Sequence, residues 1–427
     1  MGACAAILIT TIVGMTVTLA LDRHARGPQL VGLGFLYGSG VVYFVELALP
    51  RWSAVWVTAI LIVIAAGCLV AWLLGSSVGS HPATQQPSNP ATILDVVTLI
   101  VIAAYIAQFT IAPLPEMDFW AIWGVKARVF FTHGGIDWHF LAGRWNGFEH
   151  PDYPPLLPLN YAYAAMMNGG WNDAQLGLVG AAFGTALLLV VRGITARETS
   201  PLASAAITLA CAPFALAIPA GIGESPMIAF AGSGLLLLRD DDNRHAPLLL
   251  GLAACSKNEG IALLVIAALI VVLAKPRRAL RLWPAALLAA PWMLIRTFAH
   301  MQTDLVKGSF AGRVAARLPY LGGIVADLAR ALADRWIWIL IVLALLVATR
   351  DARRRQRIVF IIVAAQIAVY VIVYLGTPYD FRWSIEGSWA RLTRQMLVPA
   401  LVAAMLALAQ TMRRREDAPH AEARPDF

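Results

Sequence analysis

Charged side chains are scarce in this sequence. Only 14% of its 427 residues are Asp, Glu, Lys or Arg, whereas a soluble domain carries about 25%. The mean hydropathy is +0.70, and the chain contains repeated apolar runs of roughly 17–25 residues, each long enough to cross a bilayer. This composition excludes an ordinary soluble domain. Because the runs are continuous and do not alternate, it also excludes a transmembrane β-barrel.

Cysteine is also rare, and several common sequence motifs are missing. The four cysteines, Cys4, Cys68, Cys211 and Cys255, all lie in apolar segments, and none has the spacing of a metal site or a disulfide pair. The sequence contains no glycine-rich nucleotide-binding loop and no internal repeat of the kind that builds many transporters. We therefore expect no metal site and no cofactor, although the sequence leaves a divalent cation open as an alternative.

The net charge of +8 comes from basic clusters between the apolar runs. These clusters are Arg23 with Arg26, Lys275–Arg281, Arg350–Arg357 and Arg413–Arg415. Lys and Arg in short loops stay on the cytoplasmic side of a membrane, so the charge indicates topology and argues against binding to nucleic acid. With every cluster inside, the polar segments 113–158, 298–335 and 376–394 lie on the extracytoplasmic side.

The apolar runs predict an all-α, polytopic transmembrane bundle of about 12–13 spans. Residues 1–91 form the first helices, residues 92–411 the main bundle, and residues 412–427 a disordered cytoplasmic tail. Leu159–Met167 is too short to span and is expected to dip into the membrane. Pro247–Leu273 begins and ends at basic clusters, so it is either a hairpin of two short helices or a pair of full spans with a tight outer turn.

The longest polar interruption, residues 114–158, is predicted to be an active-site outer loop with amphipathic helices. Asp118 follows an apolar helix, with Glu116 two residues before it and Trp123 shortly after it. A carboxylate at the membrane boundary, with a cation such as Lys126 nearby, can act as a general base. The alternative is an interfacial acid beside tryptophans that only anchor the end of the helix.

The motifs follow one another in a recognisable order. An acid pair opens the outer loop, and His150-Pro151-Asp152-Tyr153-Pro154-Pro155-Leu156 closes it. Turns follow at Gly221–Pro226, at Lys257–Gly260 and at Thr377–Asp380. Together they resemble the motifs of GT-C membrane glycosyltransferases, most closely the branch of protein O-mannosyltransferases and aminoarabinose lipid A transferases.

The resemblance covers residues 94–408 and departs from the family in three places. The acids are split as Glu-Met-Asp, Glu224 stands where the family usually has Asp, and the helices before residue 92 lie outside the similarity. On this basis residues 92–411 are predicted to be the catalytic domain. As the family pattern implies, the substrate is a sugar on a polyprenyl phosphate, transferred with inversion to a lipid, glycan or protein acceptor.

The resemblance also implies roles for individual residues. The catalytic residues would be Asp118, as the general base, and Glu116. Because the leaving group is a phosphate, cations are needed to stabilise it, and these would be Lys126, Lys257, Arg391 and Arg394. The residues expected to bind substrate or shape the loop are Trp123, His150, Asp152, Tyr153, Glu224, Glu259 and Asp380.

Each of these assignments has an alternative. Lys257 and Glu259 can pair with each other, Arg391 and Arg394 can extend to lipid headgroups, and Glu224 can be a helix N-terminal acid. The competing function is a transporter or flippase of a lipid-linked saccharide, in which the cations bind phosphate but no acid reacts. The composition favours a bacterial inner membrane, with the active site on the periplasmic side.

Overall fold

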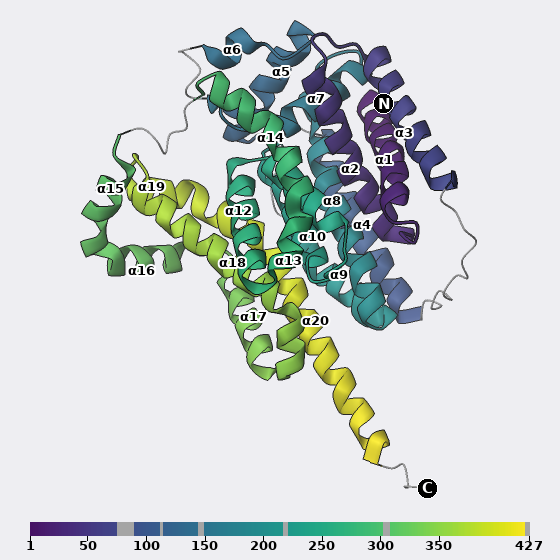
Figure 1. Ribbon diagram of the computed structural model, residues 1–427, viewed down its shortest axis with the longest axis vertical. Helices are drawn as coiled ribbons and strands as arrows, with labels where there is room; N and C mark the ends of the chain where they lie inside the picture. Colours follow the sequence, from purple (N-terminus) through teal and green to yellow (C-terminus); the bar gives the residue numbers. More distant parts are fainter. Residues whose placement is uncertain (75–88, 112–113, 144–148, 217–220, 302–307, 423–427) are drawn as a thin grey trace.

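The computed structural model describes residues 1–427 except 75–88, 112–113, 144–148, 217–220, 302–307 and 423–427. The described residues form helices and turns without any strand, and the helices pack into one bundle (Figure 1). Among the described residues, seven helical segments are long and apolar enough to cross a membrane. The chain is therefore an all-helical, multi-pass membrane protein.

The first four helices are uninterrupted apolar runs. They are α1 (Gly2–Leu21), α2 (Gly27–Ala48), α3 (Ala54–Leu74) and α4 (Asn89–Ile111). Small residues let α1 and α2 approach closely: a Cβ on Gly38 would overlap the carbonyl of Thr10, and one on Gly14 would overlap Gly34. Such close backbone contacts are a main source of helix association in membranes.

The outer loop is mostly helical. It contains η1 (Phe119–Trp123), α5 (Gly124–His133) and α6 (Trp138–Ala142), and it leads into α7 (Leu156–Met167). Asn160 of α7 donates to the Ser39 carbonyl near the middle of α2 (3.1 Å), whereas Tyr163 lies beside Thr58 at the start of α3 (3.0 Å). The chain therefore descends into the bundle before α7 and returns along it, as the predicted dipping helix requires.

The central helices surround the bundle core. They are α8 (Asp173–Glu198), α9 (Pro201–Leu216), α10 (Glu224–Leu237), α11 (His245–Ala254) and α12 (Asn258–Ala274). Every residue of α10 is buried. α11 and α12 form a hairpin of two short helices with Lys257 at its tip, which resolves the two alternatives left open for Pro247–Leu273.

The last third of the chain adds short helices and two long ones. Its elements are α13 (Pro276–Ala279), η3 (Leu280–Leu282), α14 (Trp283–Phe298), α15 (Phe310–Arg317), η5 (Leu318–Tyr320), α16 (Leu321–Ala331), α17 (Arg335–Val347), α18 (Arg350–Gly376), α19 (Phe381–Ser384), η6 (Ile385–Trp389) and α20 (Ala390–Glu422). The amphipathic pair α15 and α16 lies beside α19, on the left in Figure 1. Arg317 of α15 donates to the carbonyls of Tyr374 and Thr377, which satisfies open acceptors at the end of α18.

Two predictions need correction. The sequence predicted twelve or thirteen spans, and each predicted run does coincide with a helix. However, α9, α10, α11, α12, α14 and α17 have only 10–17 residues, because several of them pack inside the bundle or turn back as a hairpin. The predicted disordered tail, residues 412–427, is helical as far as Glu422, and residues 423–427 lie outside the described residues.

The basic clusters meet at one end of the bundle, which we call the basic end (residues 22–26, 239–245, 275–281 and 349–357). Arg239 pairs with Glu198 (2.7 Å), Lys275 pairs with Asp241, and His245 lies 3.6 Å from Asp22. The outer loop and the tip of the α11–α12 hairpin lie away from this end, on the side that we call the polar-loop end.

Candidate active site

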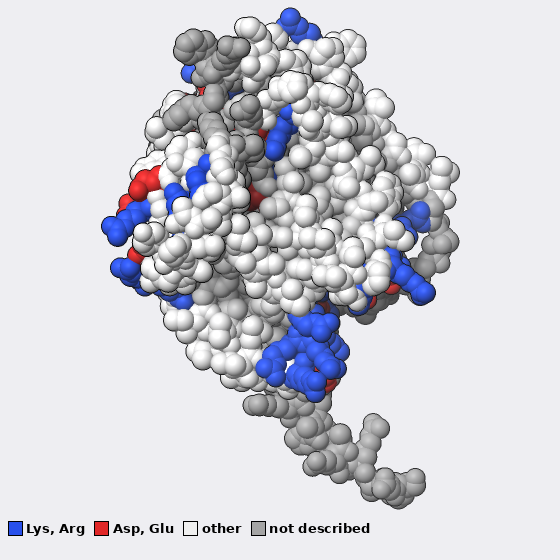
Figure 2. All heavy atoms as spheres, turned by 60° about the vertical axis from the view of Figure 1, so that its left-hand side comes forward, with Lys and Arg blue, Asp and Glu red and all other residues white. Residues whose placement is uncertain are grey.

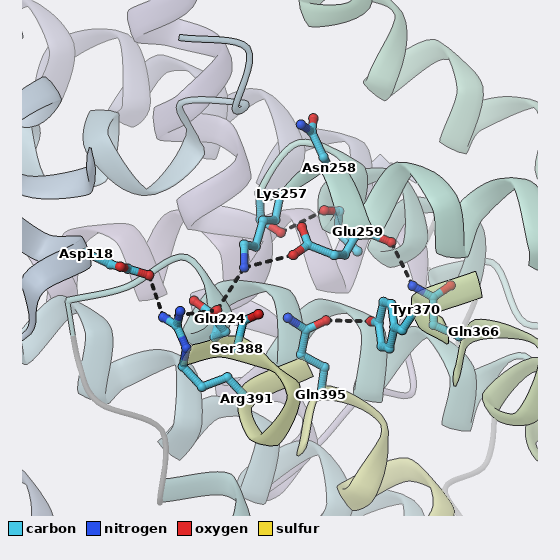
Figure 3. A network of polar contacts seen from close by, with 12 residues as sticks. Asp118, Glu224, Lys257, Asn258, Glu259, Gln366, Tyr370, Ser388, Arg391 and Gln395 are labelled. Carbon is cyan, nitrogen blue, oxygen red and sulfur yellow. Dashed lines mark hydrogen bonds and ion pairs between the residues drawn. The ribbon is translucent and has the colours of Figure 1, made fainter. Parts of the chain in front are cut away.

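Five charged side chains form a continuous chain at the polar-loop end (Figure 3). Arg391 of α20 donates to the carboxylate of Asp118 and lies 3.6 Å from Glu224 Oε1. The same Glu224 oxygen accepts from Lys257 Nζ at 2.8 Å, and Lys257 also contacts Glu259 at 2.9 Å. Charges therefore alternate along this charged network, which contains three carboxylates and two cations.

The network is buried at its centre and open at its edge. The side chains of Glu224 and Lys257 are 1% and 8% exposed, whereas that of Asp118 is 30% exposed. A buried charge is costly unless it is paired, and here each central charge has two partners of opposite sign. Asp118 is thus an accessible carboxylate fixed to the rim of a buried ionic centre.

Local structure places the two inner acids. Glu224 lies in the first turn of α10 and Glu259 in the first turn of α12, where the helix dipole favours negative charge. Gly221 precedes α10 with φ of +108°, a conformation that favours glycine. The next glycine, Gly223, lies so close to the Trp123 indole that a Cβ would overlap it.

Several polar atoms around the network have no protein partner. Glu224 Oε2, Glu259 Oε2 and Arg391 Nε are buried and without a hydrogen bond among the described residues. Buried polar atoms are normally satisfied by protein, water or ligand. Three such atoms on one ionic network mark a place where a polar ligand can bind.

Lys126 lies on α5 within the outer loop, covered by the segment that closes the loop. Its side chain is completely buried, its Nζ donates to the His150 carbonyl at 2.5 Å, and it lies 5.8 and 5.7 Å from the ring centres of Trp123 and Tyr153. Burial lowers the pKa of Lys126 to about 7, against the opposing effects of Asp152 and Glu149. This position fits a lysine that holds the loop.

Aromatic stacking orders the same loop. Tyr153 stacks on Trp123 with ring centres 5.5 Å apart, and His150 stacks on Tyr153 at 4.7 Å. His150 has a positive φ of 50°, an uncommon conformation that turns the chain sharply before Pro151. Trp123, His150 and Tyr153 thus form one stack within the loop, and their predicted roles in binding substrate or shaping the loop stay predictions.

A second polar connection links the loop to the hairpin tip. Asn258 donates to Asp152 Oδ2 at 2.6 Å and accepts from Arg296 Nη1 at 3.2 Å. Burial raises the pKa of Asp152, whereas the hydrogen bond from Asn258 and the nearby cations lower it. In Figure 3 the Asn258 side chain points away from Lys257. Lys257 therefore belongs to the charged network, whereas Asn258, the next residue, belongs to the connection with Asp152.

Arg296 was not among the residues predicted from the sequence. It is partly exposed on α14, and within the described chain it forms no ion pair, its recorded hydrogen bond being to the neutral Asn258 amide. Arg391 and Lys257, in contrast, are each paired with two carboxylates. Arg296 is therefore a guanidinium at the hairpin tip, near Asp152 and Asn258, that an anion can bind without breaking an ion pair.

Arg394 lies apart from the network, one helical turn after Arg391. It pairs with Asp334 at 2.8 Å, and Asp334 lines an apolar cavity of about 830 Å³ between α9, α17 and α20. Phe214, Trp336 and Leu401 are among the apolar side chains of its wall. The cavity thus has one acidic residue, and the cation bound to that residue lies one turn from the charged network.

The two remaining predicted residues make only local contacts. The backbone carbonyl of Glu116 accepts from Phe119 and Trp120, and no side-chain hydrogen bond or ion pair of Glu116 is present among the described residues. Asp380 caps α19 by accepting from the Trp383 amide at 2.9 Å. Their side chains therefore do not join the charged network.

Supporting polar groups that the sequence analysis did not name lie on α18, η6 and α20. Gln366 donates to the Glu259 carbonyl at 3.2 Å, Tyr370 donates to Gln395 at 2.7 Å, and the Tyr374 and Ser388 hydroxyls are 2.6 Å apart. A polar residue within an apolar helix is the one signal that could have identified Gln366 and Gln395.

Within the described residues, no group of three or more His, Cys, Asp and Glu side chains is arranged to hold a metal ion. Comparison with protein-family models, curated proteins and solved structures finds no match for the chain. A function for this protein is therefore inferred from the geometry of the site alone.

Proposed function

We propose that the protein is an integral membrane glycosyltransferase of the GT-C type that uses a polyprenyl-phosphate sugar as donor. The observation that carries the proposal is the pairing of a partly exposed carboxylate, Asp118, with Arg391 at the rim of a buried ionic network. A general base and a phosphate-binding cation lie side by side there, which the direct displacement of a lipid phosphate requires.

The apolar cavity supports a lipid-linked donor. A polyprenyl chain would occupy the space between α9, α17 and α20, past Phe214 and Trp336. Its phosphate would then lie near Arg394 and Arg391, which are one helical turn apart on α20. Arg296 would bind the same phosphate from the side of the hairpin tip, because it is not held by a carboxylate.

The reaction follows from this arrangement. The acceptor hydroxyl or amine would give its proton to Asp118 as its oxygen or nitrogen bonds to the anomeric carbon of the sugar. The bond from that carbon to the phosphate oxygen breaks, and polyprenyl phosphate leaves with the electron pair and one more negative charge. Cations that bind this charge more strongly in the transition state than in the substrate accelerate the step.

In the absence of substrate, Asp118 is paired with Arg391, and a bound substrate can replace this ion pair. While Arg391 holds the carboxylate, its Oδ2 oxygen already accepts a hydrogen bond from the guanidinium. An arriving phosphate would draw Arg391 toward itself and release Asp118 next to the bound sugar. In this proposal the donor itself activates the base.

The direction of the protein in the membrane is part of the proposal. The basic end would face the cytoplasm, so the charged network would open to the periplasmic side of a bacterial inner membrane. The acceptor is a lipid, a glycan or a protein on that side.

The test compares wild type, Asp118→Asn and Glu116→Gln, each purified and reconstituted with radiolabelled polyprenyl-phosphate sugars and membrane acceptor fractions. We expect Asp118→Asn to lose about 10²–10⁴-fold in transfer rate while it keeps donor binding and thermal stability. Glu116→Gln removes a carboxylate two residues away and is expected to keep its activity.

Three other results would count against parts of the proposal. Equal transfer by wild type and Asp118→Asn would remove Asp118 as the base. Loss of activity in Glu116→Gln alone would show that Glu116, and not Asp118, is the general base. If labelled lipid moves between leaflets without any sugar transfer, the protein is a flippase and not an enzyme.

A further inference from the structure

A second pocket lies far from the charged network, at the basic end between α12 and α18. Its volume is about 270 Å³. Its basic lining residues come from three segments of the chain: Arg239 after α10, Lys275 and Arg278 around α13, and Arg354, Arg355 and Arg357 on α18. Figure 2 shows a dense group of basic side chains at the lower end of the molecule.

Half of these cations already pair with carboxylates. Arg239 pairs with Glu198 at 2.7 Å, and Lys275 and Arg278 both pair with Asp241. These contacts fix one wall of the pocket, where three cations face two carboxylates.

The opposite wall is different. Arg354, Arg355 and Arg357 are exposed, and within the described chain none of them has a recorded ion pair or hydrogen bond from its side chain. Three guanidinium groups thus border the hollow, whose one lining carboxylate, Asp241, is paired with Lys275 and Arg278 on the opposite wall. Guanidinium groups bind phosphate through two parallel hydrogen bonds, so this wall favours a phosphate ligand.

The remaining lining is apolar. Ile270 and Val271 of α12 face the pocket together with Ile358 and Ile361 of α18. These residues precede Lys275 and follow Arg357 in the sequence, so they lie on the membrane side of the basic residues. A ligand that fills the pocket needs an anionic head and an apolar chain.

We propose that this pocket binds one anionic phospholipid, with the headgroup phosphate on Arg354, Arg355 and Arg357 and an acyl chain along the seam between α12 and α18. Basic pockets between membrane helices recognise acidic lipid headgroups in this way. This site is independent of the proposed transfer reaction.

Retention of positive charge on one side of the membrane explains why basic clusters occur in the loops. It does not explain why basic residues from three segments line one pocket. That rule needs only the number of cations in a loop. It requires neither a hollow nor the convergence of cations from separate segments. Arg277, Arg350 and Arg353 belong to the same clusters but do not line the pocket, so they provide a matched control.

The experiment uses the full chain in nanodiscs of phosphatidylcholine, with phosphatidylglycerol added at increasing fractions. Bound lipid is counted by native mass spectrometry after release, and thermal stability is measured in parallel. Wild type and the control variant Arg277→Gln/Arg350→Gln/Arg353→Gln should retain one phosphatidylglycerol. The pocket variant Arg354→Gln/Arg355→Gln/Arg357→Gln should bind it at least tenfold more weakly.

Two results would overturn the proposal. Equal weakening in both triple variants would show general attraction to an acidic membrane and no site. Competition by inorganic phosphate as strong as by phosphatidylglycerol would show that the apolar wall contributes nothing, and the ligand would then be a soluble phosphate. All substitutions are at exposed arginines, and circular dichroism with size-exclusion chromatography verifies that each variant is folded.

Discussion

Arg391 donates a hydrogen bond to Asp118 across 273 positions of sequence. The contact joins the last long helix, α20, to the first outer loop, and through Glu224 it reaches the tip of the α11–α12 hairpin. The candidate site is thus built by tertiary contacts among four separate segments. Substitutions in any one of them are expected to affect the others, and this coupling can be measured.

The Glu224–Lys257 pair should be strongly coupled. Glu224→Gln or Lys257→Met leaves a buried charge with one partner fewer, and each is expected to lower the free energy of unfolding by about 3–5 kcal/mol. The double variant should cost less than the sum of the two singles, by about 1–3 kcal/mol. Chemical unfolding in detergent measures the stability of the wild type, the two single variants and the double variant, which together form a double-mutant cycle.

The exposed pair Asp327–Arg330 on α16 is the control for this cycle. Its coupling should stay within about 1 kcal/mol, because solvent screens a surface ion pair. Additive effects at Glu224 and Lys257 would show that the two charges act separately and that the network is not a unit.

Lys126 should make stability depend on pH. Its pKa falls from 10.5 in the unfolded chain to about 7 in the folded protein, so the unfolded state binds more protons between these values. Stability therefore rises with pH in this range, by at most about 1.4 kcal/mol per pH unit. Compared with Lys126→Met, wild type should gain stability from about pH 7 upward.

Urea unfolding between pH 6.5 and 9 tests this dependence. The groups that face Lys126 are Asp152 and Glu149, so Lys126→Met with Asp152→Asn separates the lysine from its neighbours. Parallel pH curves for wild type and Lys126→Met would mean that the buried amine does not titrate in this range.

Gly223 should tolerate no side chain. A Cβ there would overlap the Trp123 indole, which is itself stacked on Tyr153. Gly223→Ala is expected to destabilise the protein by about 1–3 kcal/mol and to disturb the loop. Gly67→Ala on α3 is the control, because a Cβ at Gly67 meets no atom within 4 Å. Thermal unfolding of the two variants should differ clearly, and equal transition temperatures would contradict the packing.

Arg296 should affect donor binding more than turnover. If it binds the donor phosphate, Arg296→Gln should raise KM for the lipid-linked sugar about tenfold, a loss of about 1.4 kcal/mol, with a smaller change in kcat. Arg128→Gln, at an exposed position on α5, should leave both constants unchanged. A fall in kcat without a change in KM would place Arg296 outside the donor site.

Much of the helical architecture was predictable, because apolar runs indicate where helices lie and charged residues indicate where they end. The run before Asp22 and the run after Arg26 become α1 and α2, and the short segment before Met167 becomes the returning helix α7. Lys257 and Glu259 drew attention because two charges within an apolar hairpin require partners. These are local signals, which a single sequence contains.

The partners themselves could not be predicted from the sequence. Arg391 and Arg394 are one turn apart and looked equivalent, yet one reaches Asp118 and the other Asp334, because they face different neighbours of α20. Lys126 resembled an exposed loop cation, and only the folded loop buries it under His150 and Tyr153. Arg296 was not considered from the sequence, because its contact with Asn258 is formed only in the folded protein.

The seam between α2 and α7 has a consequence for the first 91 residues. The Asn160 amide binds the Ser39 carbonyl, Tyr163 binds Thr58, and the backbone of Asn168 lies against Gly2. A chain that began at residue 92 would expose the buried side of α7 to lipid and lose the surface on which its preceding loop is seated. The opening helices therefore support both α7 and the outer loop, and shortening the protein from its amino end would first disorder the residues around Gly134, because Arg51 donates to the His133 carbonyl and Trp52 to the Gly134 carbonyl.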